Sequence, residues 1–479
     1  MTELTSEDND YIKKIFARPS KKQEIGFAFS SFYILLFGMW GSLQLYAVTV
    51  LLIPIFFIPI MYLIYSIVDG FNDPLIGYYT DRSKRFIEKY GKRYPWIIIG
   101  SLLAPIPLFL AFIPIVEINS DENSVIIAVI WITIMMCLFE TFATLREVSQ
   151  EALFPDLFRY EDQRSKVLGI AMLFTLIAQL MAAIFLPLFI AHLGGATESV
   201  AFIGTALLII IITYIVLIPY AIWGVRETDE MKQLRIKLDQ EIKVHEPVKK
   251  VVKRIFKDRN WMGLVIAFLI WGSGGLCFIG GTSYFVLHYL GLGIEVMVLP
   301  GLLLIAFAVI SIPFWVRLSR KISVKRLYIV GLSFSAIGFF AFFFVNDYTG
   351  YVIMSAFMGI IWSGNWGITF KMVQAQAIDN AAVINGKREE ASYIGIFRVF
   401  SAFTYFFQSL IFVIVWTLTG YIPEKRANQT ELAKLGLKLN ISLIPAALAL
   451  IAIIIFAIMY TITKEESITN KKKLAELGL

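Results

Sequence analysis

The segment VDGFNDPLIG, residues 68–77, places two aspartates at the end of a long stretch without charge. From residue 25 to residue 68 the chain has no Asp, Glu, Lys, Arg or His. Asp69 and Asp73 are four residues apart with Asn72 between them, so the three side chains share one side of a helix. A charge inside a bilayer is costly unless it faces protein, water or an ion. The segment therefore predicts a membrane helix with a functional polar face.

The rest of the chain is equally apolar. Of its 479 residues 58% are hydrophobic and 16% are charged, whereas an average soluble domain is about 25% charged. Apolar runs long enough to cross a bilayer recur about twelve times. They are apolar throughout and do not alternate like barrel strands, so we expect an all-α membrane protein. The expected spans are 25–46, 48–79, 95–115, 124–154, 166–192, 199–224, 260–288, 293–317, 326–345, 349–377, 391–418 and 440–462.

The charged loops predict how the spans are oriented. The loops DRSKRFIEKYGKRYPW, FRYEDQRSK and RLSRKISVKR are basic, whereas EINSDENS, AHLGGATES, HYLGLGIE and NDYTG contain no Lys or Arg. By the positive-inside bias both termini should be cytoplasmic, in a plasma or inner membrane. The basic loop EKRANQTELAKLGLK, before the last span, opposes this pattern.

A polar stretch divides the spans into two sets of six. Residues 225–259 contain eleven Lys or Arg and seven Asp or Glu, which predicts a cytoplasmic linker between two related halves. Within it, HEPVKKVVKRIFKDRN is either a basic amphipathic helix on the membrane surface or a plain helical linker. The predicted organisation is an N-terminal segment 1–24, a bundle 25–224, the linker 225–259, a bundle 260–462 and a tail 463–479.

The fourth expected span has a second polar face, within FETFATLREVSQEALFP (139–155). Steps of four, three and four residues place three acids and a threonine on one side of the helix. Three acids on one face are too costly to meet lipid, so the face should line a polar cavity, although an internal salt bridge would account for one or two of them. The face consists of Glu140, Thr144, Glu147 and Glu151, and the neighbouring stripe of Arg146 and Gln150.

The second half has fewer polar groups in its spans. IIWSGNWGITFK (360–371) contains Trp362, Asn365 and Trp366. Aromatic rings stack on the apolar faces of sugars and Asn bonds hydroxyls, which favours a substrate wall; Trp pairs also serve as packing or interface anchors. Lys371 and Arg398 are charges in or near spans ten and eleven.

Four motifs in order resemble those of a known family. DGFNDPLIGYYTDRSKR (69–85) with GKRYPW, EALFPDLFRYEDQRSK (151–166) and AIDNAAVINGKREEASYIG (377–395) are similar to segments of the glycoside–pentoside–hexuronide:cation symporters, the melibiose permease-like family of the major facilitator superfamily. The resemblance extends over about residues 25–460. It implies twelve helices in two pseudo-symmetric six-helix bundles that move a solute together with a cation.

The resemblance also implies which residues bind the cation. Two carboxylates a helical turn apart repel unless a proton or cation lies between them, and their oxygens suit a hard cation; a structural pair with loop arginines is the alternative. The cation is expected to be Na⁺, with H⁺ or Li⁺ as alternatives, and no other cofactor is expected. The implied cation ligands, which are metal ligands if Na⁺ is coupled, are Asp69, Asn72, Asp73 and Thr144.

The sugar half of the family's site is largely replaced. The family's sugar-binding acid of helix four falls on Glu147, and its sugar-stacking Trp falls on Glu151, which cannot stack. Its charged residues of helices one, five and eleven fall near Ser30 and Ser31, Ala171 and Ala402. The resemblance therefore supports cation coupling more strongly than specificity for a particular sugar.

We expect a monomeric secondary symporter of a sugar or sugar-derived solute, which is neither an enzyme nor a nucleic-acid-binding protein, with the bilayer as its other partner. A transporter of lysophospholipid or another non-sugar solute, and a non-transporting sensor or scaffold, are the alternatives. No GxxxxGK[ST] motif for ATP is present. The expected substrate contacts are Arg146, Glu147, Gln150, Glu151, Trp362, Asn365 and Trp366, and the expected cytoplasmic gate is Asp81, Arg82, Lys84 and Arg85.

Overall fold

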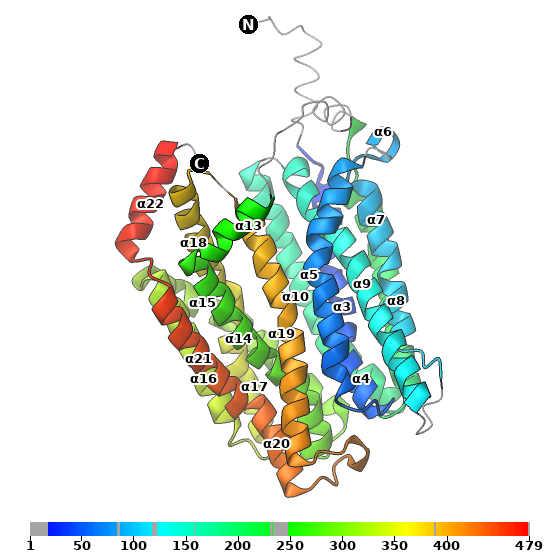
Figure 1. Ribbon diagram of the computed structural model, residues 1–479. Helices are drawn as coiled ribbons and strands as arrows, with labels where there is room; N and C mark the ends of the chain where they lie inside the picture. Colours follow the sequence, from blue (N-terminus) through cyan, green and yellow to red (C-terminus); the bar gives the residue numbers. More distant parts are fainter. Residues whose placement is uncertain are drawn as a thin grey trace, which may run out of the picture.

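The structure is a computed structural model that describes residues 18–83, 87–116, 122–158, 160–229, 232, 248–387 and 389–477. These residues form helices and no strands, and the long helices run side by side (Figure 1). Eleven helices of the described chain are long and apolar enough to cross a membrane. A further helix of 26 residues, α5, lies among them and is less apolar because it carries Asp69, Asn72 and Asp73. The predicted all-α membrane fold is confirmed.

The first half contains six spans, several of them divided into shorter helices. The first span continues to Thr49 and Pro54 lies in the connection after it, so the second span begins at Phe57 and not at residue 48 as expected. The first span comprises α2 (Lys21–Ala28), the 3₁₀ turn η1 (Phe29–Tyr33), α3 (Ile34–Gly41) and α4 (Leu43–Thr49). The others are α5 (Phe57–Arg82), α7 with α8 (Tyr94–Leu103, Pro105–Ala111), α9 (Glu122–Leu157), α10 (Glu161–His192) and α11 with the π-helical η2 (Ser199–Pro219, Tyr220–Gly224), while α6 (Ile87–Tyr90) is a short loop helix.

In the described residues the second half also contains six spans, with the surface helices α13 (Val248–Lys257) before it and α22 (Lys464–Leu477) after it. Its first three spans are α14 with the π-helical η3 (Arg259–Tyr284, Phe285–Tyr289), η4 with α15 (Ile294–Met297, Val298–Lys321) and α16 (Val324–Phe342). The tenth span is α17, the π-helical η5 and α18 (Tyr348–Trp362, Ser363–Thr369, Phe370–Asn385). The last two are α19 (Glu390–Thr419) and α20 with α21 (Glu431–Ile441, Leu443–Met459), with the short η6 (Pro423–Lys425) between them.

Side-chain caps define where five of these helices begin. At each start, a side-chain oxygen accepts a hydrogen bond from the backbone N–H three residues further on. Such a bond satisfies one of the donors that the first turn leaves free and stabilises the helix by about 1 kcal/mol. The capping residues are Ser20, Asp258, Ser323, Asp347 and Thr430.

The last span begins earlier than expected, at Glu431 and not at residue 440. Lys434 and Lys438, which the sequence places in a basic loop, therefore lie on α20. Lys438 is buried and its Nζ donates to Oδ1 of Asn346 at 2.5 Å. Part of the basic loop that opposed the positive-inside pattern is thus a helix whose lysine is paired inside the protein.

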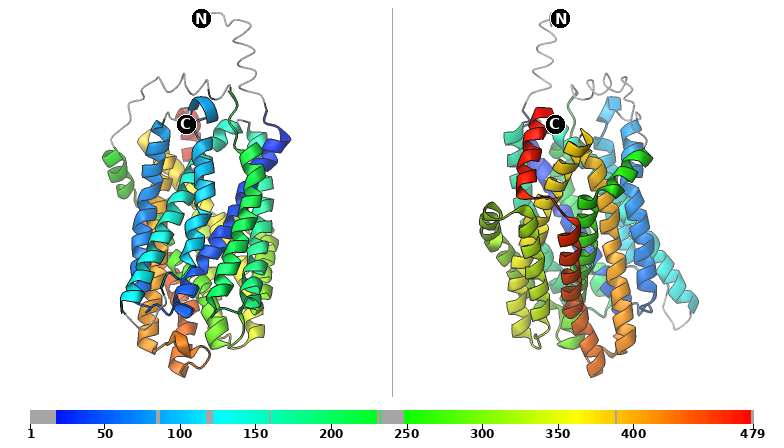
Figure 2. Two further views of the ribbon diagram at one scale, coloured as in Figure 1. Left: turned by 90° about the vertical axis from the view of Figure 1, so that its right-hand side faces the viewer. Right: turned by 60° about the vertical axis from the view of Figure 1, so that its left-hand side comes forward.

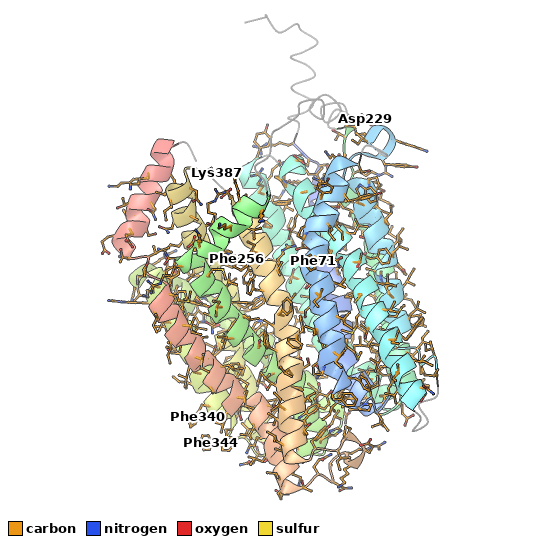
Figure 3. The ribbon with its side chains drawn as sticks, viewed as in Figure 1. Phe71, Asp229, Phe256, Phe340, Phe344 and Lys387 are labelled. Atoms are coloured by element: carbon orange, nitrogen blue, oxygen red, sulfur yellow. The ribbon has the colours of Figure 1, made fainter. Side chains whose placement is uncertain are left out.

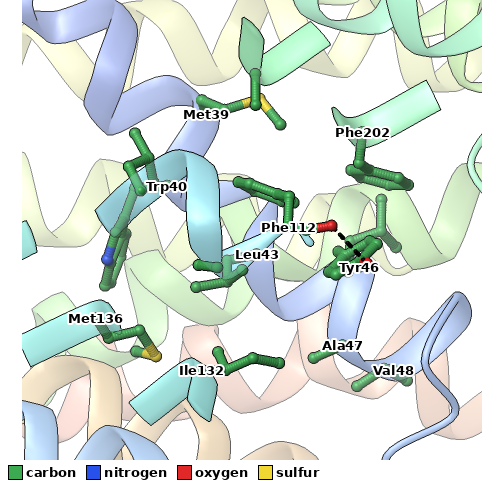
Figure 4. Packing of buried hydrophobic residues seen from close by; sticks show 14 of the residues in the cluster. Met39, Trp40, Leu43, Tyr46, Ala47, Val48, Phe112, Ile132, Met136 and Phe202 are labelled. Atoms are coloured by element: carbon green, nitrogen blue, oxygen red, sulfur yellow. Dashed lines mark hydrogen bonds between the residues drawn. The ribbon is translucent and has the colours of Figure 1, made fainter. Parts of the chain in front are cut away.

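Both halves contribute to one hydrophobic core at the end of the molecule remote from α6, α13 and α22. Tyr46 and Phe112 of the first half belong to it together with Tyr284 and Trp416 of the second half, and all four are buried. Figure 4 shows the first-half part, where the Tyr46 hydroxyl donates to the Phe112 carbonyl at 2.8 Å. The Tyr284 hydroxyl donates to the backbone oxygen of Gln44 at 3.2 Å, so a hydrogen bond also joins the halves there.

At the opposite end, the described residues of each half form a separate core. Phe27, Phe158 and Tyr220 pack together in the first half. Trp261 and Tyr393 pack together in the second half. Between the two ends α5 packs along α19, and α10 packs against α15. The two halves are therefore most tightly joined at the end remote from α13.

The outer surface of the helices carries large apolar side chains. Phe71 on α5 and Phe340 on α16 are more than half exposed, as is Phe344 just beyond α16 (Figure 3). Such a surface is costly in water and is solvated by lipid tails in a membrane. This distribution agrees with a chain that crosses the bilayer many times.

Candidate functional site

The polar face of α5 meets the polar face of α9. Asn72 is buried, and its Nδ2 donates to Oγ1 of Thr141 at 3.2 Å. Asp69 lies one turn earlier on α5, and its carboxyl group lies close to the carboxyl group of Glu140. The helical periodicity that the sequence shows in both spans therefore brings two acids face to face.

Glu140 is the centre of this cluster and is almost completely buried. It accepts hydrogen bonds from the Tyr65 hydroxyl at 2.8 Å and from Thr144 Oγ1 at 3.3 Å. Two carboxyl groups so close repel each other unless a proton or a cation is shared between them. Carboxylate and hydroxyl oxygens are also the groups that bind hard cations. Asp69, Glu140 and Thr144 thus form an oxygen-rich cluster between α5 and α9.

Arg398 connects the two halves of the molecule next to this cluster. From α19 its Nη1 donates to Asp73 Oδ2 on α5 at 2.8 Å, and its Nη2 donates to Glu151 Oε1 on α9 at 2.6 Å. The Asp73 side chain is 19% exposed and the Glu151 side chain 64% exposed, so the first pair is the better shielded of the two. Asp73 is therefore paired with an arginine from the other half, while Asp69 faces Glu140.

Arg146 organises a second polar group within the first half. Its guanidinium donates to Glu147 Oε1 and to Gln150 Oε1, both at 2.9 Å, and lies over the Tyr33 ring at 4.2 Å. The Tyr220 hydroxyl also donates to Gln150 Oε1, at 2.5 Å. A close approach of α7 to α9 positions Arg146, because a side chain at Gly100 would meet the Arg146 backbone nitrogen at 2.7 Å.

The structure places hydrogen bonds at the positions where the resemblance implies charged residues and this chain has none. Ser31 Oγ donates to the Ala171 carbonyl at 2.9 Å, which joins the first and fifth spans. Ser66 Oγ donates to the Ala402 carbonyl at 2.8 Å, which joins α5 to α19. Arg398 lies one turn before Ala402, so α19 still supplies a cation near the same place.

The two Trp residues of the tenth span lie together, whereas Asn365 between them points elsewhere. Trp362 and Trp366 stack with ring centroids 5.9 Å apart, and Trp366 is 47% exposed. Asn365 is fully buried, and its Nδ2 donates to the Gly331 carbonyl of α16 at 2.8 Å. Lys371 is exposed. Trp366 is thus the exposed ring of the pair, whereas Asn365 is used to hold α16 and η5 together.

The predicted cation ligands therefore lie close together on α5 and α9 but in two groups. Asp69 and Thr144 both contact Glu140, while Asn72 and Asp73 have other partners. The predicted gate is outside what the structure describes, because Lys84 and Arg85 and the side chains of Asp81 and Arg82 are not among the described groups.

The sequence did not assign a function to Glu140 or to Arg398. The sequence spacing could have identified Glu140, since it lies four residues before Thr144 on the polar face of α9. Arg398 is visible only as a charge in an apolar span. Among the described residues, no group of three or more His, Cys, Asp and Glu is arranged to hold a metal ion. The Asp69–Glu140 cluster is instead a two-carboxyl site with hydroxyl oxygens beside it.

Comparison with known sequences assigns the chain to a family. Residues 25–464 match the profile described as MFS/sugar transport protein. The chain belongs to this family. As a member of the major facilitator superfamily it is a membrane transporter and not an enzyme.

The relatives that the chain matches are named for different solutes. The chain is 24% identical to the sodium-dependent lysophosphatidylcholine symporter 1 of Gallus gallus, with 91% of this chain and 85% of that one covered. It is 23% identical to the raffinose carrier protein of Pediococcus pentosaceus, where the match covers 85% of this chain and 63% of the carrier. Among solved structures, a D-xylose–proton symporter is similar with a TM-score of 0.61 at 14% identity, covering 95% of this chain and 99% of that chain. The likeness to solved structures shows the twelve-helix fold.

Proposed function

We propose that this transporter couples the movement of a sugar or sugar-derived solute to the movement of a monovalent cation, with Na⁺ as the first candidate. The observation that carries the proposal is the pair of facing carboxyl groups of Asp69 and Glu140, one turn away from the Asp73–Arg398 contact between the halves. A cation at the pair changes the charge next to that contact. Cation binding is thereby linked to the relative position of the two halves.

The proposed cation site extends the ligand set expected from the sequence. Asp69 and Glu140 supply the negative charge and Thr144 supplies a hydroxyl oxygen. Asp73 joins the site when Arg398 releases it, and the carbonyl oxygen of Asn72 lies on the same side of α5. Because coupling is reciprocal, the solute should raise the affinity for the cation by the same factor as the cation raises the affinity for the solute.

The solute is proposed to bind between the halves, against Glu147, Gln150, Glu151 and the exposed ring of Trp366. The hydroxyls of a sugar would form hydrogen bonds with Glu147, Gln150 and Glu151, and the apolar face of its ring would stack on Trp366. Arg146 is proposed to balance the charge of Glu147, which it contacts at 2.9 Å. The match to a raffinose carrier agrees with this choice.

A lysophospholipid is the second candidate solute. The observation in its favour is that the match to the lysophosphatidylcholine symporter covers 85% of that protein, whereas the match to the raffinose carrier covers 63%. Three exposed aliphatic or aromatic side chains on α5 itself, Ile67, Phe71 and Leu75, face outward near Asp69 and Asp73 and would suit an acyl chain.

We further propose that the end carrying α6, α13 and α22 faces the cytoplasm, as the basic loops predict. The bundles 25–224 and 260–462 would then alternate between openings toward the two sides, with the described structure most tightly joined at the outer end.

The test is uptake into proteoliposomes, with a matrix of solutes and cations. Sugars, sugar acids and lysophosphatidylcholine are each offered with inward gradients of Na⁺, Li⁺ or H⁺, and with choline as the neutral control. Accumulation of one solute class driven by one cation gradient supports the proposal. Binding of a solute without accumulation under any gradient would instead identify a sensor or scaffold.

Variants then test the cation site separately. Asp69→Asn, Glu140→Gln and Asp73→Asn should each abolish or strongly reduce the cation dependence of uptake. Glu431→Gln is the matched control, because the Glu431 side chain is 90% exposed and lies far along the chain on α20. Unchanged cation dependence in all three site variants contradicts the assignment.

A further inference from the structure

The surface helix α13 has a basic side and an apolar side. At 100° per residue, Lys249, Lys250, Lys253 and Lys257 fall within an arc of about 100°. The apolar residues fall within a separate arc of about 140°, at the edge of which Phe256 lies next to Lys249. All four lysines are exposed, and the helix contains no acidic residue. Among the described residues none of these lysines has an ion-pair partner. The basic side therefore presents four lysine charges that no acid of the described residues pairs.

The apolar side of α13 is partly used to dock the helix. Ile255 is completely buried and Val251 packs beside it in the core of the second half. Phe256 lies 6.1 Å from the Phe400 ring of α19 but remains 51% exposed. An exposed Phe next to the lysine arc is an arrangement typical of helices that lie in the interface of a membrane.

Polar contacts at Arg254 and Asp258 fix the orientation of α13 on the bundle. Arg254 forms an ion pair with Glu389, the residue that precedes α19, and Lys387 pairs with the same carboxylate at 3.0 Å. Asp258, directly after α13, caps α14 and accepts a hydrogen bond from the Tyr393 hydroxyl at 3.3 Å. The lysines consequently have a defined direction relative to the spans.

The position of α13 in the chain places it at the membrane surface. Only Asp258 separates it from α14, a span that begins at Arg259. Figure 2 shows α13 at the flank of the bundle, at the end that also carries α22, and Figure 3 labels Phe256 and Lys387 in the same region. A helix one residue from the start of a span must lie near the headgroups of that leaflet.

We propose that the lysine side of α13 binds anionic phospholipid headgroups of the leaflet next to it, with Phe256 inserted among the acyl chains. Four lysines held in one arc, without an ion-pair partner among the described residues, match a surface of phosphate groups, and the docked side of the helix fixes their direction. The lipid surface would thereby hold the beginning of α19, which carries Arg398 nine residues after Glu389.

The test uses the full chain in detergent with phosphatidylcholine, titrated with phosphatidylglycerol of the same acyl chains, and follows the midpoint of thermal unfolding. A ligand that binds the folded state raises this midpoint as its concentration passes the dissociation constant. Phosphatidylglycerol should raise it, whereas added phosphatidylcholine and inorganic phosphate should not. An equal effect of inorganic phosphate would overturn the proposal in favour of a free-anion site.

Two triple variants locate the effect. Lys250, Lys253 and Lys257 are replaced by Gln in one variant, and the exposed Lys464, Lys472 and Lys473 of α22 are replaced in the other. Each lysine near an anionic surface contributes about fivefold to binding, so the α13 variant should need about 100-fold more phosphatidylglycerol. The α22 variant should behave as the wild type. Equal losses in both variants, or none in the α13 variant, overturn the proposal.

A charge-preserving variant controls for damage to the fold. If the α13 variant has a lower midpoint of thermal unfolding than the wild type in phosphatidylcholine alone, replacement of the same three lysines by Arg separates loss of charge from damage to the fold. The Arg variant must regain the response to phosphatidylglycerol if charge is what the lipid recognises. Failure of the Arg variant to regain it also overturns the proposal.

Discussion

Arg398 gives the most specific prediction about the cation site, because its guanidinium is a permanent positive charge next to the position proposed for the bound cation. Asp69 and Asp73 are one turn apart and Arg398 contacts Asp73 at 2.8 Å, so the guanidinium lies roughly 8 Å from a cation at Asp69. At an effective dielectric constant of about 20, this repulsion is about 2 kcal/mol. The Arg398 side chain is 33% exposed, and solvent reduces the value to about 1 kcal/mol.

Replacing Arg398 with Gln removes that repulsion and should tighten cation binding about fivefold. The measurement is a Na⁺ titration of intrinsic tryptophan fluorescence without solute, with K⁺ and choline as reference salts. Trp40 is suited to report binding, since its ring lies 5.1 Å from Tyr65, which donates to Glu140. Maximal uptake should fall at the same time, because the contact between the halves is lost.

The controls separate charge from shape. Arg398→Lys keeps the charge and should keep the Na⁺ affinity near the wild-type value. Combining Arg398→Gln with Asp73→Asn removes a positive and a negative charge together and should reverse most of the gain. An unchanged or weaker Na⁺ affinity in Arg398→Gln would refute the assignment of the cation to Asp69 and its neighbours.

Three further predictions concern the packing, the solute and the cation. Gly100→Ala should lower the midpoint of thermal unfolding and reduce the free energy of unfolding by about 1–3 kcal/mol, because the new Cβ would lie 2.6 Å from a backbone oxygen of α9. Gly41→Ala is the control and should leave the midpoint unchanged, because no atom lies within 4 Å of its new Cβ. Trp366→Ala should weaken solute binding about fivefold and leave the Na⁺ titration unchanged, since stacking on an aromatic ring contributes about 1 kcal/mol. A shifted Na⁺ titration would argue against a solute contact. Glu140→Gln should remove the Na⁺-dependent fluorescence change, and a retained change would place the cation elsewhere.

The helices and their polar faces were predictable because they depend on local periodicity. Asp69, Asn72 and Asp73 lie on one side of α5, and the acids of α9 lie on one side of that helix, as the spacing requires. The spans in which they occur were recognised from apolar length alone. These features need no knowledge of how the helices pack.

The pairing between helices was not predictable in the same way. Whether Asp69 faces Glu140 or Thr144 depends on how far one helix is shifted along the other, which spacing within each helix does not determine. The partners of Arg398 depend on the docking of the two halves. Asn365 is used in packing for the same reason, because its amide donates to the Gly331 carbonyl of α16, a partner that depends on how α16 and η5 dock.

The core that both halves share at one end has a consequence for how the transport cycle responds to temperature and salt. Opening that end exposes Tyr46, Phe112, Tyr284 and Trp416 to water, a change with a large heat capacity that becomes easier in the cold. The closure predicted at the opposite end is ionic and is weakened by salt instead. Cooling should therefore favour the state that is open at the end with the shared hydrophobic core, and added salt should favour the state that is open at the opposite end. A bent Arrhenius plot of uptake would show that the rate-limiting opening changes from the hydrophobic closure to the ionic one.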